Sequence, residues 1–123
     1  MNAFTLATQH GYAATATMMR SKRDAEYDVF SRVTGMLRQA ERQGLGASTI
    51  AAVHKNNELW TILATDLAEP GNALPDEVKA GLLSLAGFSI RHGHAVMAGD
   101  ATTDALIDIN LSVMKGLRGE VAA

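Results

Sequence analysis

The sequence contains no cysteine, only two prolines and few aromatic residues. Without cysteine the chain can form no disulfide, no thiolate nucleophile and no thiolate metal site. It also lacks an apolar run near the roughly 20 residues that a membrane-spanning helix requires. Its first residues lack the charged start and apolar core of a secretory signal. We therefore expect a cytoplasmic protein that has no membrane partner.

What the chain does contain is enough apolar material for one hydrophobic core. Hydrophobic residues make up 47% of its 123 residues and charged residues 20%, which is a globular composition. This length predicts a single helical domain over residues 1–123, because it is too short for a catalytic domain and a regulatory domain together.

The charge of the chain disfavours direct nucleic-acid binding. The net charge is −2, whereas proteins that bind the phosphate backbone rely on clustered lysine and arginine. Residues 1–55 hold seven basic and four acidic side chains, and residues 56–123 hold four and nine. We interpret these charges as solvated helix faces in preference to a bipolar functional surface.

The most informative stretch is residues 57–75, which contains the only tryptophan. Its apolar residues recur at helical spacings: Leu59, Trp60, Ile62, Leu63 and Leu67. Pro70 must end this helix, and Pro75 presets the first turn of another helix, whose next two residues are acidic and complement its dipole. The stretch predicts a helical hairpin with Trp60 in its interior, where the indole N–H needs a partner.

Helical periodicity continues through the rest of the chain, and no segment has the period of two that is typical of strands. We expect helices at residues 4–18, 22–43, 48–69, about 75–99 and from Asp104 onward. Short loops between helices favour antiparallel neighbours. The predicted fold is therefore all-α, a single-domain bundle of about five helices, mainly antiparallel.

Two boundaries of these helices have specific signals. Ser21 and Asp24 have capping-box spacing, which predicts a helix start at Ser21, and Ser48 or Thr49 can cap the third helix. The first helix contains Gly11, which weakens it by about 1 kcal/mol. It is a candidate for an element that yields to a partner helix, and a permanently packed helix is an equal alternative.

The last helix is apolar over an unusually wide arc. Such a helix is either sandwiched in the core or partly exposed for binding. Asn110 lies within this arc and needs a hydrogen-bond partner. The two apolar stripes consist of Leu106, Ile109, Val113 and Leu117, and of Ile107, Leu111 and Met114.

The sequence contains no arrangement of residues that predicts catalysis, a cofactor or a metal ion. His92 and His94 are two residues apart, so on a helix they point to nearly opposite sides, and we interpret them as surface residues. Asp66 opposes the dipole of its helix. We expect it to bind backbone N–H groups or an asparagine side chain in the turn rather than to act in acid–base catalysis. We therefore expect a protein that is not an enzyme.

Three ordered blocks of residues resemble FlaF, a family of flagellar biosynthesis regulators in alphaproteobacteria. The central block comprises Asn57, Leu59, Trp60, Asp66, Leu67, Asn72, Leu74 and Pro75. The preceding block comprises Glu26, Tyr27, Phe30, Val33 and Thr34. The following block comprises Leu106, Ile107, Asp108, Ile109, Asn110, Met114, Gly116 and Leu117. We expect Asn57, Asn72 and Asn110 to form a buried polar network that fixes the turn.

The resemblance implies a cytoplasmic protein that is needed for flagellin synthesis and export, in partnership or opposition with the regulator FlbT. Because the amphipathic ends of flagellin would aggregate if exposed, the favoured role is a flagellin-binding secretion chaperone with an apolar groove. The alternative is a post-transcriptional regulator that acts on flagellin mRNA, directly or through FlbT. The candidate flagellin contacts are Met18, Met19, Met36, Ile107, Leu111 and Met114.

Overall fold

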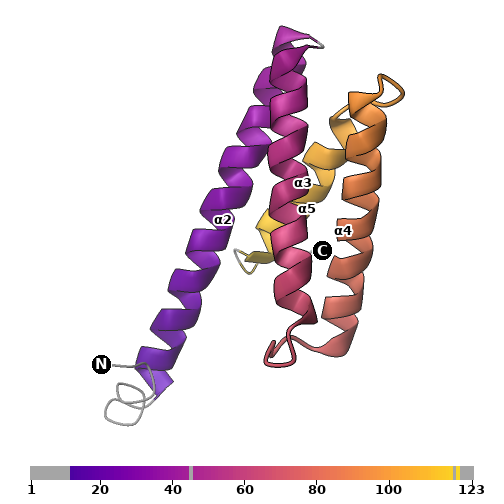
Figure 1. The fold of residues 1–123 in the computed structure, drawn as a ribbon. Helices are drawn as coiled ribbons and strands as arrows, with labels where there is room; N and C mark the ends of the chain where they lie inside the picture. Colours follow the sequence, from indigo (N-terminus) through magenta and orange to yellow (C-terminus); the bar gives the residue numbers. More distant parts are fainter. Residues whose placement is uncertain (1–11, 45, 118, 120–123) are drawn as a thin grey trace.

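Four antiparallel helices make up nearly all of the described chain (Figure 1). The computed structural model describes residues 12–44, 46–117 and 119. The helices are α2 (Tyr12–Gln43), α3 (Ala47–Ala68), α4 (Asp76–Met97) and α5 (Asp104–Leu117). No β-strand occurs in these residues. The predicted all-α class is therefore confirmed.

The helices are arranged as a ring of four neighbours. Helix α3 packs against α2 and α4, and α5 closes the ring by packing against the same two helices. In Figure 1, α5 lies behind α3, so α3 and α5 occupy opposite corners. Each helix reverses direction from the one before it, because short loops connect them at alternating ends.

The predicted number of helices is wrong for the described residues, because no boundary occurs at Ser21. Helix α2 continues without interruption from Tyr12 to Gln43. Residues 12–34 contain neither glycine nor proline and are rich in alanine, methionine and basic residues, which favour continued helix. A serine that could cap the start of a new helix does not by itself end the helix that precedes it. Most of the helix expected at 4–18 lies outside the described residues, and the remainder forms the start of α2.

The loop between α2 and α3 depends on glycine rather than on a side-chain cap. Gly44 has a φ of 81°, in the left-handed region that glycine adopts without strain. Gly46 occupies the N-cap position of α3 and makes no side-chain cap bond. The prediction of a Ser48 or Thr49 cap is wrong because the helix starts earlier, at Ala47. The Thr49 hydroxyl instead donates to the Gly44 carbonyl at 3.3 Å.

The core contains two clusters, one toward each end of the bundle. The upper core, near the α2–α3 and α4–α5 loops, contains the buried residues Leu37, Ala40, Ala52, Val53, Val96, Leu106 and Ile107. The lower core, toward the α3–α4 turn, contains the buried residues Phe30, Trp60, Ala86 and Met114. Two half-buried hydrophobic side chains pack against the upper core, whereas ten pack against the lower core. The lower core is therefore the less completely covered of the two.

Helix length explains this difference. Helix α5 has 14 residues, and α3 and α4 have 22 each. At 1.5 Å per residue, α3 and α4 are longer than α5 by about 12 Å. Figure 1 shows that α5 begins near the upper end of α4 and stops above the α3–α4 turn. Among the residues that the structure describes, the lower end of the bundle therefore has no fourth helix over this length.

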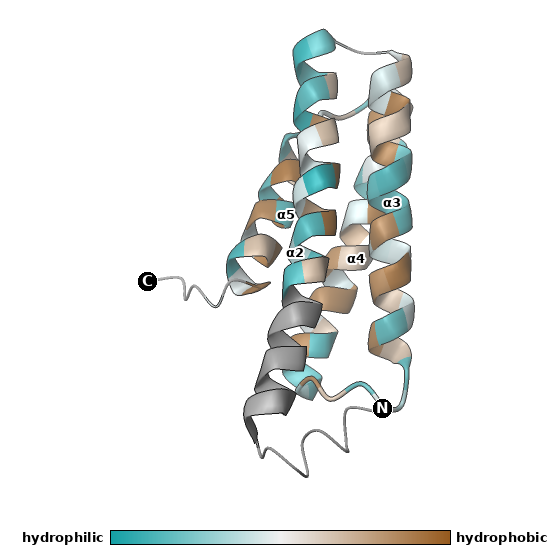
Figure 2. Cartoon of the chain, turned by 90° about the vertical axis from the view of Figure 1, so that its left-hand side faces the viewer, coloured by the Kyte–Doolittle hydropathy of each residue, from teal (hydrophilic) through white to brown (hydrophobic). Residues whose placement is uncertain are grey.

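The wide apolar arc of α5 is used inside the bundle. Its buried residues are Leu106, Ile107, Asn110 and Met114, and its other apolar residues are half-buried against the lower core. Of the two alternatives left open by the sequence, the structure favours a helix sandwiched in the core. Figure 2 shows that α2, by contrast, presents mainly hydrophilic residues on its outward side.

Candidate binding surface

A chain of buried amide hydrogen bonds joins α3 to α5 through the centre of the bundle. The Trp60 indole Nε1 donates to Asn110 Oδ1 at 3.0 Å. Asn110 Nδ2 in turn donates to Asn56 Oδ1 at 2.7 Å. All three side chains are fully buried. Because an unpaired polar group is costly in this environment, these bonds favour one register of α5 against α3.

The structure brings only Asn110 of the three predicted asparagines into this network. Asn56, which the sequence reasoning missed, accepts the bond expected near Asn57. The two asparagines precede Trp60 by four and three residues, and both spacings lie on the same side of a helix. Spacing alone therefore could not distinguish them. Asn57 instead turns toward Gly93 of α4, and its Oδ1 is buried without a hydrogen-bond partner among the described residues.

The three sequence blocks meet around the indole. Phe30 makes an edge-on contact with Trp60, with ring centroids 5.6 Å apart and an interplanar angle of 82°, a favourable aromatic geometry. The Thr34 hydroxyl donates to the Phe30 carbonyl at 2.7 Å and lies 3.9 Å from the Met114 sulfur. Residues from all three blocks that carry the family resemblance therefore meet in the lower core, whereas Leu106 and Ile107 of the following block belong to the upper core.

Asn72 organises the turn between α3 and α4. Its Nδ2 donates to the Asp66 carbonyl at 3.3 Å, and its Oδ1 accepts the Leu74 N–H at 3.1 Å, an arrangement typical of asparagine in turns. Pro75 then occupies the N-cap position of α4. Asn72 thus fixes the turn without joining the central network.

Within the turn, Asp66 bonds its neighbours through its backbone carbonyl and not through its carboxylate. The carbonyl accepts both the Asn72 amide and the Glu69 N–H, the latter at 3.2 Å. The side chain is exposed, and no group in the described chain donates to its carboxylate. The prediction that the carboxylate binds the turn is therefore wrong, because the asparagine side chain bonds the carbonyl instead.

The predicted flagellin contacts are not gathered on one surface. Ile107 and Met114 are each only 7% exposed and belong to the core; α2 and α4 flank their helix and leave them unavailable to a partner. Leu111 is half-buried. Met36 is 39% exposed and lines a shallow groove between α2 and α3 with Gly35. The side chains of Met18 and Met19 lie outside the part that the structure describes.

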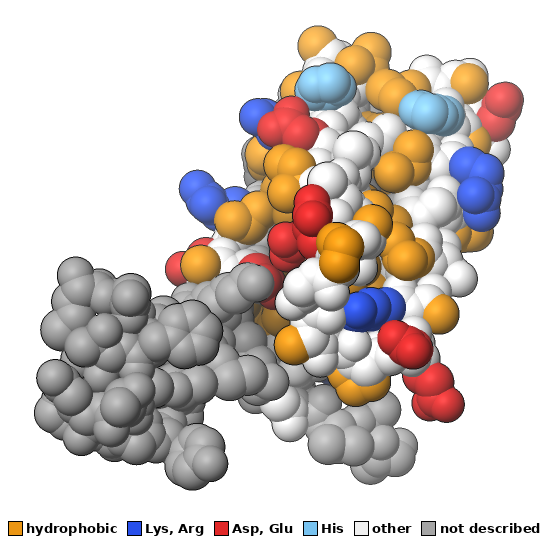
Figure 3. Space-filling view, turned by 60° about the horizontal axis from the view of Figure 1, so that its bottom comes forward, with side chains coloured by type: hydrophobic (Ala, Val, Ile, Leu, Met, Phe, Trp, Pro, Cys, Tyr) orange, Lys and Arg blue, Asp and Glu red, His pale blue; other side chains and the backbone are white. Residues whose placement is uncertain are grey.

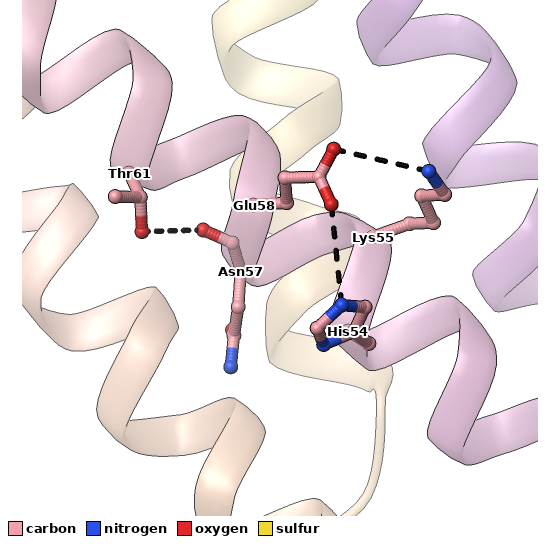
Figure 4. A network of polar contacts seen from close by, with 5 residues as sticks. All are labelled: His54, Lys55, Asn57, Glu58 and Thr61. Atoms are coloured by element: carbon pink, nitrogen blue, oxygen red, sulfur yellow. Dashed lines mark hydrogen bonds and ion pairs between the residues drawn. The ribbon is translucent and has the colours of Figure 1, made fainter.

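A second groove follows the outer side of the α3–α4 pair, where Ile62, Ile90 and Met97 are its apolar residues. Polar side chains border it. The Glu58 carboxylate lies 3.9 Å from His54 Nε2 and 3.8 Å from Lys55 Nζ. Figure 4 shows these three side chains together, with Asn57 on the opposite side of Glu58 from Lys55. Exposed ion pairs of this kind contribute about 0–1 kcal/mol, so this groove is a surface feature with little electrostatic organisation.

A third group of exposed and half-buried apolar residues extends from the end of α5 toward the α3–α4 turn, and we name it the open end. It consists of Leu63, Leu74, Val78, Leu82 and Leu85. These side chains are half-buried or exposed, with Val78 at 44% and Leu74 at 42%. The open end adjoins the lower core, since Leu63 and Leu85 belong to both. Of the three surfaces, the open end is the one that is continuous with the buried core.

The described residues do not provide a metal site. No group of three or more histidine, aspartate or glutamate side chains among them could hold an ion. His92 bonds the Thr102 carbonyl at 2.9 Å through Nε2 and stacks on Phe88 with ring centroids 5.4 Å apart. His94 lines the outer α3–α4 groove instead. None of the described helices is long and apolar enough to cross a membrane.

Comparison with known proteins identifies one family. A family model described as "Flagellar protein FlaF" matches residues 8–117. This span includes all four helices and the three blocks that meet around Trp60. No curated protein and no solved structure gives a significant match to the chain.

Proposed function

The chain belongs to the FlaF family of flagellar proteins, and we propose that it is a flagellin-binding secretion chaperone, needed for flagellin synthesis and export during flagellum assembly. In this proposal the protein works in the cytoplasm, is not an enzyme and needs no cofactor. The observation that supports the role is the open end, an apolar surface continuous with the core.

The physical basis is the need to cover an aggregation-prone partner. The polymerising ends of flagellin are amphipathic and would associate with one another if they were exposed before export. A helical bundle can hold such a segment by accepting its apolar face into a groove. Met36, and the methionines at 18 and 19 of α2, remain candidate contacts, because methionine side chains adapt to varied partners.

We expect calorimetry to show that flagellin binds this protein through one of its terminal segments. Intact flagellin, and flagellin lacking either terminal segment, would be titrated into the protein at low and high salt. Burial of apolar surface should give a negative heat-capacity change and binding that persists in high salt. Removal of one terminal segment should abolish binding.

Two results would contradict this proposal. One is equal affinity for all three flagellin forms, and the other is complete loss of binding in moderate salt. A mobility-shift experiment with flagellin mRNA, with and without FlbT, would be run beside it at physiological ionic strength. An RNA shift without flagellin binding would support the post-transcriptional role instead.

A further inference from the structure

We propose that the open end is the docking site for a partner amphipathic helix that carries basic residues beside its apolar stripe. The partner helix would lie below α5 and continue the fourth corner of the bundle toward the α3–α4 turn. This inference rests on the proposed function, because it names the surface and the kind of flagellin segment involved.

In the described part of the chain, no helix follows α5 at this corner of the bundle. Helix α5 ends at Leu117, and Gly119, with a φ of 78°, donates its N–H to the Gly116 carbonyl at 3.0 Å. A glycine in this conformation terminates a helix. Helices α3 and α4 are about 12 Å longer than α5, which corresponds to about two helical turns. A short partner helix, and not a long one, therefore fits the position.

The side chains at the open end are apolar like those of the core, but no described helix covers them. Val78 and Leu82 extend the stripe of α4 that becomes buried at Ala86 and Ser89, where α5 is present. Leu63 lies on α3 between the buried Trp60 and Leu67. On α4 the same face is thus buried beside α5 and exposed beyond it, whereas on α3 Leu67 stays buried at 3% exposure. An apolar stripe on the partner would complete the burial of the α4 face.

The charge around the open end selects a basic partner. Asp66, Glu69, Asp76 and Glu77 are all exposed there, and the described basic residues nearby are Lys79 on α4 and Lys115 in the last turn of α5. Figure 3 shows acidic side chains among hydrophobic ones on this face. Opposite charges across an interface guide and orient association.

Helix stability does not explain all of these acids. Asp76 and Glu77 stabilise the first turn of α4. Asp66, however, lies in the last turn of α3, which contains no basic residue, so its charge opposes the helix dipole. A residue that weakens its own helix and leaves its carboxylate in solvent is suited to bind a cation on a partner.

Two exposed residues of α4 give a matched test. Val78 lies at the open end and is 44% exposed, and Leu83 lies outside it on the same helix and is 39% exposed. We expect Val78→Lys to weaken binding of flagellin by about tenfold or more, because it places a charge in the apolar site and repels a basic partner. Leu83→Lys should change binding less than about twofold. Circular dichroism would verify that both variants are folded.

Synthetic peptides separate the docking site from the identity of the partner. One 18-residue amphipathic peptide would carry lysines beside a leucine stripe, and another would carry glutamates at the same positions. The lysine peptide should bind the protein more tightly, and both Val78→Lys and Asp66→Asn should reduce this preference. Salt should weaken its binding without abolishing it, and Asp66→Asn should lessen the salt effect.

Each outcome distinguishes the two proposals. Undiminished flagellin binding by Val78→Lys would overturn the docking site and leave the chaperone role standing. Lysine-peptide binding at the open end without any flagellin binding would support the site and contradict the chaperone role. A concentration-dependent dimer that Val78→Lys dissociates would identify a second copy of this chain as the occupant and overturn the proposed partner.

Discussion

Asn110 is the residue on which the polar interior depends, because one side chain bonds both the Trp60 indole and the Asn56 oxygen on another helix, although Asn56 Nδ2 has no partner among the described residues. Its oxygen accepts from Trp60 and its nitrogen donates to Asn56. An asparagine can do both because its amide has separate donor and acceptor atoms. An apolar residue at this position would leave two buried groups unpaired.

Two adjacent asparagines allow a stringent test of this network. Asn56→Ala removes the acceptor for the Asn110 amide, and we expect the free energy of unfolding to fall by about 1–3 kcal/mol. Asn57→Ala removes an oxygen that has no described partner, and we expect a change of only about 0.5 kcal/mol. Urea unfolding followed by circular dichroism measures both. A larger loss for Asn57→Ala would show that the network is wrongly assigned.

The interior position of an aromatic residue could be predicted from the sequence, whereas its partners could not. Trp60 shares a helix face with Leu63 and Leu67, so helical periodicity indicates burial. The choice between Asn56 and Asn57 depends on how far α3 is rotated toward α5, and periodicity does not fix that rotation. Likewise, only the folded turn determines that Asp66 contributes its carbonyl.

At the scale of helices, α3 and α4 pack tightly against each other at Gly93. A Cβ atom at this position would lie 2.5 Å from Asn57 Oδ1 and 3.0 Å from Val53 Cγ1. Both distances are too short for atoms of buried side chains to accept without movement. Glycine is therefore needed here for close packing and not for its backbone conformation.

We expect Gly93→Ala to destabilise the protein although alanine favours helix. The crowding costs about 1–3 kcal/mol and offsets a gain of about 1 kcal/mol in helix propensity. Gly81→Ala on the same helix is the control, because a Cβ there meets nothing within 4 Å, and it should stabilise by up to about 1 kcal/mol. Thermal unfolding of both variants and of Gly93→Ala with Asn57→Ala measures these effects.

The combined variant is the decisive comparison. It should recover part of the stability lost by Gly93→Ala, because the closest contacting atom has been removed. Stabilisation by Gly93→Ala alone would show that the two helices are further apart than in the structure.

The helices themselves could be predicted well where glycine or proline bounds them. Pro70 and Pro75 place the α3–α4 turn correctly, and Gly44 marks the end of α2. The boundary at Ser21 could not be predicted, since a potential cap does not oppose the strong helix formers on both sides of it. The extent of α5 relative to its neighbours also follows from packing and not from local sequence.

For the whole molecule, the two core clusters predict unequal local stability. The upper core is almost fully enclosed, whereas half-buried side chains surround the lower core. We expect amide hydrogens near Val53 and Val96 to exchange more slowly than those near Leu63 and Leu82, because opening the lower end exposes less additional apolar surface. Hydrogen exchange measured by NMR would resolve the two regions.

Flagellin binding should change the rate of amide exchange at the lower end of the bundle alone. Added flagellin should slow exchange at Leu63 and Leu82 and leave the amides near Val53 and Val96 nearly unchanged. Faster exchange near the upper core than at the lower end in the free protein would contradict the unequal enclosure of the two cores.

The order of the helices along the chain also governs how the bundle assembles during translation. Most of the helix packing joins elements that are adjacent in sequence, whereas the α2–α5 packing and the α3–α5 hydrogen bonds join distant segments. Such local contacts favour fast folding. Yet α5, the last of the four helices to leave the ribosome, supplies residues to both cores and the acceptor for the Trp60 indole. During translation, the two core clusters formed by α2, α3 and α4 therefore remain incomplete until the fourteen residues of α5 have emerged.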